Sequence, residues 1–113
     1  MKKKKALIIG DSWISGKDIK KNLEPYFNNK INFNYVDWNH KNLHELQNDN
    51  LKIEMGDIES IKNTSKIYKN IKEYNIIIVH FAPLKKNIFV NNTNLEIIAS
   101  LRSGLDNISR EAK

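Results

Sequence analysis

Two apolar runs in the second half of the chain constrain the fold more than any other feature of the sequence. The first, Asn75–Phe81 (NIIIVHF), is the most apolar stretch, and the second, Leu95–Ser100, follows it after a short spacer that contains an apolar turn. Apolar runs of this length, bounded by turn residues, are typical of parallel strands that are covered on both faces. We therefore expect both runs to be strands of a parallel sheet, with Asn75–Phe81 at its centre.

Further strands are predicted in the first half of the chain. Lys5–Gly10 is a short apolar strand, and Ile31–Trp38 alternates apolar and polar residues as an edge strand does. Leu51–Met55 alternates in the same way. Strands that alternate with helices indicate right-handed βαβ units, so the sequence predicts an α/β fold: a flavodoxin-like open parallel sheet of about five strands with helices on both faces.

The helices are predicted from caps and from apolar residues at helical spacing. Ser15 is placed to cap a first helix, which Pro25 should kink or end. Residues 42–46 form a short helix at best. Apolar residues recur at helical spacing over residues 58–74, where Asn63-Thr64-Ser65 would interrupt the helix. Asn107 is expected to cap a last helix.

Length and hydropathy place the chain among globular proteins. With 113 residues, of which 40% are hydrophobic, and no linker or repeat, we expect one domain over residues 1–113. No apolar run reaches the roughly 20 residues of a membrane span, and the basic N-terminus leads into too short an apolar stretch for a signal peptide. We therefore expect a cytoplasmic protein that has no membrane partner.

Charge and cysteine content exclude further classes of function. The net charge of +6 comes almost entirely from lysines that are spread over the chain without interleaved aromatic residues. Specific nucleic-acid readers rely on arginine and stacking aromatics, so we expect no nucleic-acid partner. The chain has no cysteine, which excludes disulfides and cysteine-bound metals.

The segments around the two apolar runs resemble a known family. NIIIVHFAPL at residues 75–84 and NLEIIASLRSGLDNI at residues 94–108 are similar to the N-terminal part of the D-isomer-specific 2-hydroxyacid dehydrogenases. The start of the chain, KALIIGD, also agrees with one bacterial branch of that family. The resemblance covers the whole chain, strongly from residue 75 onward and weakly over residues 28–72.

The resemblance implies that the chain is part of an NAD-dependent oxidoreductase that transfers a hydride between NAD(H) and a 2-hydroxy or 2-oxo acid. In the family, backbone N–H groups of one strand-end loop hold the substrate carboxylate, and a glycine there lets the backbone approach the ligand closely. The loop after the preceding strand lines the substrate cleft, and an arginine would attract the acid. The substrate-binding residues implied in this chain are Phe81, Ala82, Pro83, Arg102, Ser103 and Gly104.

Departures from the family bear on activity. The loop has the single glycine Gly104, and Ser109 stands where the family usually has Asp. The G-x-G-x-x-G fingerprint that cradles the NAD pyrophosphate does not occur in the sequence. The family's catalytic Arg, His and carboxylate lie beyond the matched region, so no catalytic residue is carried over. We therefore expect the chain alone to be inactive and to bind no NAD(H).

The resemblance also bears on partners. It implies that the chain is the N-terminal segment of a substrate-binding domain and that the Rossmann cofactor domain is missing from it. The segment would act together with that Rossmann domain or with a C-terminal segment. A homodimer is also an option. A free-standing flavodoxin-like binding or interaction module is the alternative. A fragment should expose an apolar patch and self-associate, whereas an independent module should be a stable monomer.

A second alternative is a hydrolase. Gly10-Asp11-Ser12 resembles the GDS block of one class of serine hydrolases, with Ser12 as the nucleophile. Residues 37–40 have the D-x-x-H spacing of that class, which makes His40 the candidate base. The simpler interpretation of Asp11 and Ser12 is a turn that leaves the strand and starts a helix.

Other signals are weaker. His40 and His44 have the i,i+4 spacing that suits zinc on a helix, but no third ligand is evident, so we expect no metal. His80 is interpreted as a satisfied buried histidine at a strand end. A receiver-like signalling module would need an acidic pair after the first strand, where only Asp11 is present.

Overall fold

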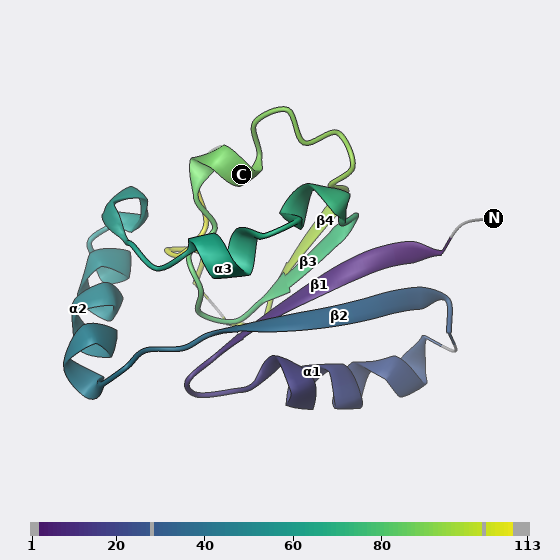
Figure 1. Ribbon diagram of the computed structural model, residues 1–113, viewed down its shortest axis with the longest axis horizontal. Helices are drawn as coiled ribbons and strands as arrows, with labels where there is room; N and C mark the ends of the chain where they lie inside the picture. The colour runs from purple at the N-terminus through teal and green to yellow at the C-terminus, as the bar shows by residue number, and fades with distance from the viewer. Residues whose placement is uncertain (1–2, 28, 103, 110–113) are drawn as a thin grey trace.

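The computed structural model describes residues 3–27, 29–102 and 104–109. Within them the chain forms one all-parallel sheet of four strands, in the order β2-β1-β3-β4 (Figure 1). The strands are β1 (Lys4–Asp11), β2 (Ile31–Trp38), β3 (Ile76–Val79) and β4 (Ile97–Ser100). The predicted class, an open parallel α/β sheet, is confirmed, with four strands in the described residues rather than about five.

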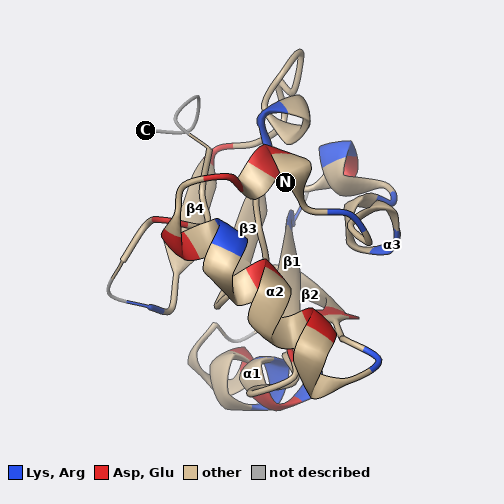
Figure 2. Cartoon of the chain, turned by 90° about the vertical axis from the view of Figure 1, so that its left-hand side faces the viewer, with Lys and Arg blue, Asp and Glu red and all other residues tan. Residues whose placement is uncertain are grey.

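Helices cover both faces of the sheet. They are α1 (Gly16–Leu23), α2 (Leu43–Glu54) and α3 (Ser65–Tyr68), with 3-10 turns at Glu24–Tyr26, Ile58–Ser60, Ile71–Glu73 and Lys86–Ile88. In Figure 1, α1 lies below the sheet and α3 above it. Figure 2 shows that both basic and acidic residues occur along α1 and α2.

The two faces have separate apolar cores because successive residues of a strand point to opposite sides. Ala6 and Ile8 of β1 pack with Ile19 of α1 in the smaller core. Leu7 and Ile9 belong to the larger core, which also contains side chains from α2 and α3. β1 is therefore covered on both faces, as its apolar sequence predicts.

Local signals account for α1. The Ser15 hydroxyl accepts a hydrogen bond from the Asp18 N–H at 3.1 Å, which caps the first turn as predicted. The helix ends at Leu23, and Pro25 lies in the 3-10 turn that follows. A proline removes a backbone donor and blocks the preceding helical turn, which explains this end.

The predicted strand Leu51–Met55 is wrong, because these residues form the end of α2 and its cap. The helix begins after Asn42, whose side chain accepts from the Glu45 N–H at 2.9 Å. Ile53 is buried in the core, whereas Leu51 and Met55 are exposed, so the three residues do not share a face. Three alternating residues are too few to distinguish a strand from a helix turn.

The segment over residues 58–74 is less regular than the helical spacing predicted. Asn63 and Asn70 adopt left-handed backbone conformations, with φ of 64° and 59°, and divide the segment into short pieces. The expected interruption at residues 63–65 is thus confirmed, and a second one occurs at Asn70. Asparagine tolerates this conformation, and the isoleucines of the segment are buried in the larger core despite the two breaks. No helix in the described part of the chain is both long and apolar enough to cross a membrane.

Candidate functional site

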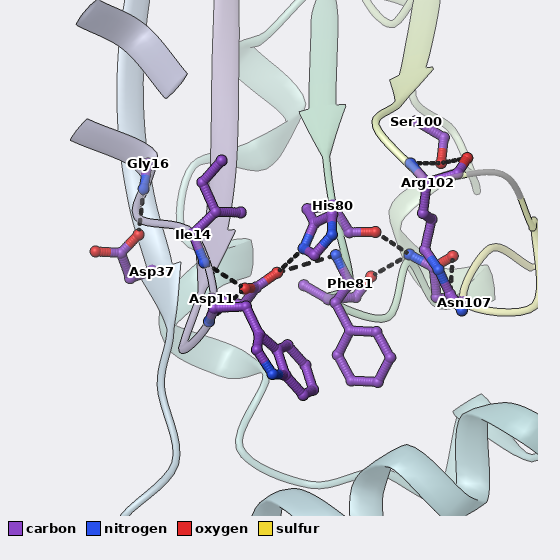
Figure 3. Close-up of polar contacts among 11 residues, drawn as sticks. Asp11, Ile14, Gly16, Asp37, His80, Phe81, Ser100, Arg102 and Asn107 are labelled. Atoms are coloured by element: carbon purple, nitrogen blue, oxygen red, sulfur yellow. Dashed lines mark hydrogen bonds and ion pairs between the residues drawn. The ribbon is translucent and has the colours of Figure 1, made fainter. Parts of the chain in front are cut away.

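The candidate site lies at the carboxyl edge of the sheet, where the loops after β1, β3 and β4 come together (Figure 3). The parallel register aligns Ile9 with Val79, and Val79 with Ser100, so these three strands end at the same edge. Ligands of open α/β sheets bind at this edge. Four polar side chains gather there: Asp11, His80, Arg102 and Asn107.

Asp11 ends β1 and is the most extensively bonded of the four. Its side chain is 1% exposed. One oxygen, Oδ1, accepts from the N–H groups of Trp13 and Ile14 at 2.9 and 3.0 Å. The other, Oδ2, accepts from the Phe81 N–H at 3.1 Å and contacts His80 Nδ1 at 2.7 Å. The donors compensate for the burial of the carboxylate and join the turn after β1 to the loop after β3.

His80 is the first residue after β3, and its ring is only partly buried. Nδ1 contacts Asp11, while the side chain is 29% exposed. His80 was predicted to be a buried, hydrogen-bonded histidine at a strand end. The hydrogen bond and the position are confirmed, but the side chain is not fully buried. A buried carboxylate that orients a partly exposed imidazole is an arrangement that acid–base and hydrogen-bonding sites use.

Asn107 joins the loop after β3 to the loop after β4. Its buried side-chain amide donates to the carbonyl of Ala82 at 2.9 Å and to that of His80 at 3.5 Å. Beside it, the Leu84 N–H donates to the Asn107 carbonyl at 2.7 Å, within a parallel bridge between Leu84 and Ile108. The prediction that Asn107 caps a helix is therefore wrong within the described residues, because Asn107 lies in a turn and the next residue, Ile108, forms the bridge instead of a first helical turn.

Arg102 is oriented toward the middle of the site. Its Nη1 donates to Asn107 Oδ1 at 3.4 Å, and its guanidinium carbon lies 5.2 Å from the centre of the Phe81 ring. No carboxylate of the described residues forms an ion pair with it. Gly104 is open, since a Cβ built there would meet its nearest neighbour, Asp106 Oδ2, at 3.8 Å. Ser103, a predicted substrate-binding residue, lies outside the described residues.

The loop over residues 81–83 has buried side chains. Phe81, Ala82 and Pro83 therefore offer no open apolar wall to the site. The exposed Trp13 packs edge-on against Phe81, with ring centres 4.8 Å apart. The Phe81 ring thus contacts both Trp13 and Arg102.

Tyr68 of α3 forms hydrogen bonds to the end of this loop. Its hydroxyl donates to the Pro83 carbonyl at 2.5 Å and accepts from the Lys85 N–H at 3.0 Å. Burial raises the pKa of the Tyr68 hydroxyl far above its ordinary value. The bond from Lys85 lowers that pKa in part, and the charge of Glu59 adds a smaller increase.

The histidines of the hydrolase and zinc interpretations are engaged elsewhere. His40 is buried against α2, with Nε2 2.8 Å from Asp49 Oδ2 and its ring 4.3 Å from that of Trp38. His44 Nε2 lies 3.3 Å from Asn48 Nδ2. The structure thus directs His40 to Asp49 rather than to Ser12. Across residues 3–27, 29–102 and 104–109, no group of three His, Cys, Asp or Glu side chains is placed to hold a metal ion.

The contact between Asp11 and His80 was not predicted from the sequence. The two residues are 69 positions apart, and only the order of the strands makes them neighbours. The available signal was that each follows an apolar strand, because such residues share an edge in a parallel sheet. In the comparisons with known proteins, no family model, no curated protein and no solved structure matches this chain.

Proposed function

We propose that this chain is the substrate-binding part of an NAD-dependent D-2-hydroxyacid dehydrogenase, and that the loop after β4 binds the carboxylate of a 2-hydroxy or 2-oxo acid. The observation that carries the proposal is the setting of Arg102. Its guanidinium is held by Asn107 and Phe81 at the ligand-binding edge, and no described carboxylate neutralises it.

The chemistry of this group suits an acid. A guanidinium has five N–H donors in a planar fork that matches a carboxylate, and the bond from Arg102 to Asn107 uses only Nη1. The adjacent Gly104 has space where a side chain would otherwise stand, so a ligand is able to approach its backbone. Both features support an anion at the end of β4.

The described turn after β1 is poorly suited to the pyrophosphate of NAD(H). The first turn after β1 is where such a group would bind in a nucleotide-binding unit, at the N-terminus of α1. Asp37 Oδ1 already accepts the Gly16 N–H there at 2.7 Å, and the buried Asp11 ends the strand alongside. Two carboxylates in this position would repel a pyrophosphate. In our proposal, NAD(H) therefore binds to a Rossmann domain outside this chain.

A titration followed by NMR tests the carboxylate site. Hydroxypyruvate added to the ¹⁵N-labelled chain is expected to shift the Gly104 amide and the Arg102 guanidinium signals, and Arg102→Gln, which removes the guanidinium, should abolish the shift of the Gly104 amide. Lys4→Gln is the matched control, because it removes one positive charge at the opposite edge, where Lys4 pairs with Glu96. Equal weakening by the two substitutions would show that only net charge matters, and the proposal would then be wrong.

Gly104→Ala refines the test. The added methyl group has space in the fold, so stability should change little, yet it would obstruct a ligand that approaches the backbone. We expect weaker binding with unchanged unfolding behaviour. The chain alone should show no NADH oxidation with pyruvate or hydroxypyruvate, and oxidation above background would contradict the assignment of cofactor binding to another domain.

The alternative, a free-standing binding or interaction module, differs in its solution behaviour. β4 is an edge strand, and Ile97 and Leu101 are exposed at that edge. Exposed apolar residues beside an open edge favour a further segment or a second chain packing there. Light scattering that shows self-association would support the dehydrogenase proposal, whereas a stable monomer at high concentration would favour the independent module.

A further inference from the structure

We propose that Asp11 and His80 form a dyad that presents His80 Nε2 as a hydrogen-bond acceptor, so that the site selects acids with a hydroxyl group next to the carboxylate. The inference rests on the proposed function, because it takes Arg102 as the group that binds the carboxylate. It adds a second recognition group that the family resemblance does not assign.

The tautomer of His80 follows from its partner. A carboxylate offers only acceptors, and Asp11 Oδ2 lies 2.7 Å from His80 Nδ1 while it also accepts the Phe81 N–H. The proton of the neutral imidazole must therefore be on Nδ1. Nε2 then carries a lone pair, which accepts a hydrogen bond from a hydroxyl and has nothing to donate to a carbonyl oxygen.

Asp11 acts as a positioning residue. Its carboxylate is fixed by the N–H groups of Trp13, Ile14 and Phe81, so the acceptor that faces His80 does not turn with the ring. The His80 side chain is 29% exposed, so part of it reaches the surface. The dyad therefore combines a buried, fixed carboxylate, that of Asp11, with the partly exposed side chain of His80.

His80 and Arg102 belong to the same edge. Phe81 joins them, since its N–H bonds to the Asp11 oxygen that also holds His80, while its ring lies under the Arg102 guanidinium. Asn107 also connects His80 and Arg102, because its side-chain amide donates to the His80 carbonyl and accepts from Arg102 Nη1 (Figure 3). A fixed cation and a fixed acceptor on one edge complement a ligand that carries a carboxylate and a hydroxyl.

Trp13 adds an apolar component. Its ring is 56% exposed and packs on Phe81 beside the dyad. An aromatic surface at the margin of a polar site favours a ligand with an apolar or aromatic side chain. The probes are therefore D-phenyllactate, phenylpyruvate and 3-phenylpropionate, which share the ring and the carboxylate and differ only at the carbon next to the carboxylate.

The first measurement is the tautomer of His80 in the full chain, from long-range ¹⁵N–¹H NMR spectra at neutral pH. We expect the signature of a proton on Nδ1. Asp11→Asn should remove this preference, because a carboxamide can also turn its NH₂ toward the ring. A neutral His80 with its proton on Nε2 in the unmodified chain would overturn the inference.

The second measurement is the affinity for the three acids. D-phenyllactate should bind about 3- to 10-fold more tightly than 3-phenylpropionate, which is the contribution of one hydrogen bond. Phenylpyruvate should share the weaker affinity of 3-phenylpropionate. His80→Ala should remove the difference between the acids, and His44→Ala, at an exposed histidine of α2, should leave it unchanged.

The outcomes separate the two proposals. If all three acids bind equally and Arg102→Gln weakens each of them, the carboxylate site stands and the role of His80 is wrong. If Arg102→Gln leaves the affinity for every acid unchanged while His80→Ala removes the preference for the hydroxyl, the dyad stands and the role of Arg102 is wrong. If none of the acids binds, both proposals are wrong.

Discussion

Removal of the Asp11 carboxylate is the most direct test of how the site is built. Asp11→Ala leaves three backbone N–H groups without their acceptor, those of Trp13, Ile14 and Phe81, and leaves His80 Nδ1 without a partner. The Phe81 bond is buried, so its orphaned N–H should cost about 1–3 kcal/mol. The other three contacts are part-buried and reachable by water, so each should cost about 1 kcal/mol.

The expected total is a loss of about 4–6 kcal/mol in the free energy of unfolding, which is a large part of the stability of a small domain. Urea denaturation followed by tryptophan fluorescence measures it. Asp11→Asn keeps the shape and one acceptor oxygen, so it should lose less and provides a folded variant if the alanine variant does not fold.

Asp37→Ala is the matched control, because it removes the same charge from the end of the neighbouring strand. Within the described residues, the Asp37 side chain accepts one hydrogen bond, from the Gly16 N–H, so the expected loss is about 1 kcal/mol. If both alanine variants lost the same free energy to within about 0.5 kcal/mol, Asp11 would not be the central acceptor and the argument would be refuted.

Three further predictions concern the fold around the site. Gly10→Ala should prevent or severely weaken folding, because its Cβ would overlap the backbone at the start of α1, and a circular dichroism spectrum like that of the parent chain would contradict this. Asn107→Ala should cost about 2–4 kcal/mol in urea denaturation, because it orphans a buried carbonyl and releases two loops, whereas the exposed Asn22→Ala should cost under about 0.5 kcal/mol. The raised pKa of Tyr68 keeps its hydroxyl protonated in the folded state above the ordinary value of 10.0, where the unfolded chain loses the proton. Stability should therefore be retained below pH 10.0 and fall as pH rises above it; Tyr68→Phe should reduce this slope, and the exposed Tyr26→Phe should not.

Elements with strong local signals were predicted well. The runs that became β1, β2, β3 and β4 lie inside the predicted strands or extend them by one residue, because their apolar or alternating patterns leave few alternatives. The cap at Ser15 and the end of α1 before Pro25 also depend only on neighbouring residues. The fold class follows from the succession of these elements.

Predictions failed where tertiary packing decides between local alternatives. Leu51–Met55 has a two-residue alternation, but a longer helix buries Ile53 and leaves the other apolar residues of that stretch exposed. Asn70 breaks a helical pattern that the sequence continues, and its neighbour Ile71 still reaches the core. In both places the burial of one isoleucine determines the local structure more than the propensity of its neighbours does.

The sequence by itself determined the four strands, the cap of α1 and the class of sheet, because periodicity and caps are local properties. Only the tertiary structure decided which polar groups meet at that edge. Asp11 pairs with His80, 69 residues away, because β1 and β3 are neighbours in the sheet, whereas His40 turns to Asp49 on α2. A buried polar side chain must find a partner within hydrogen-bond distance, and the order of the strands determines which partners are that close.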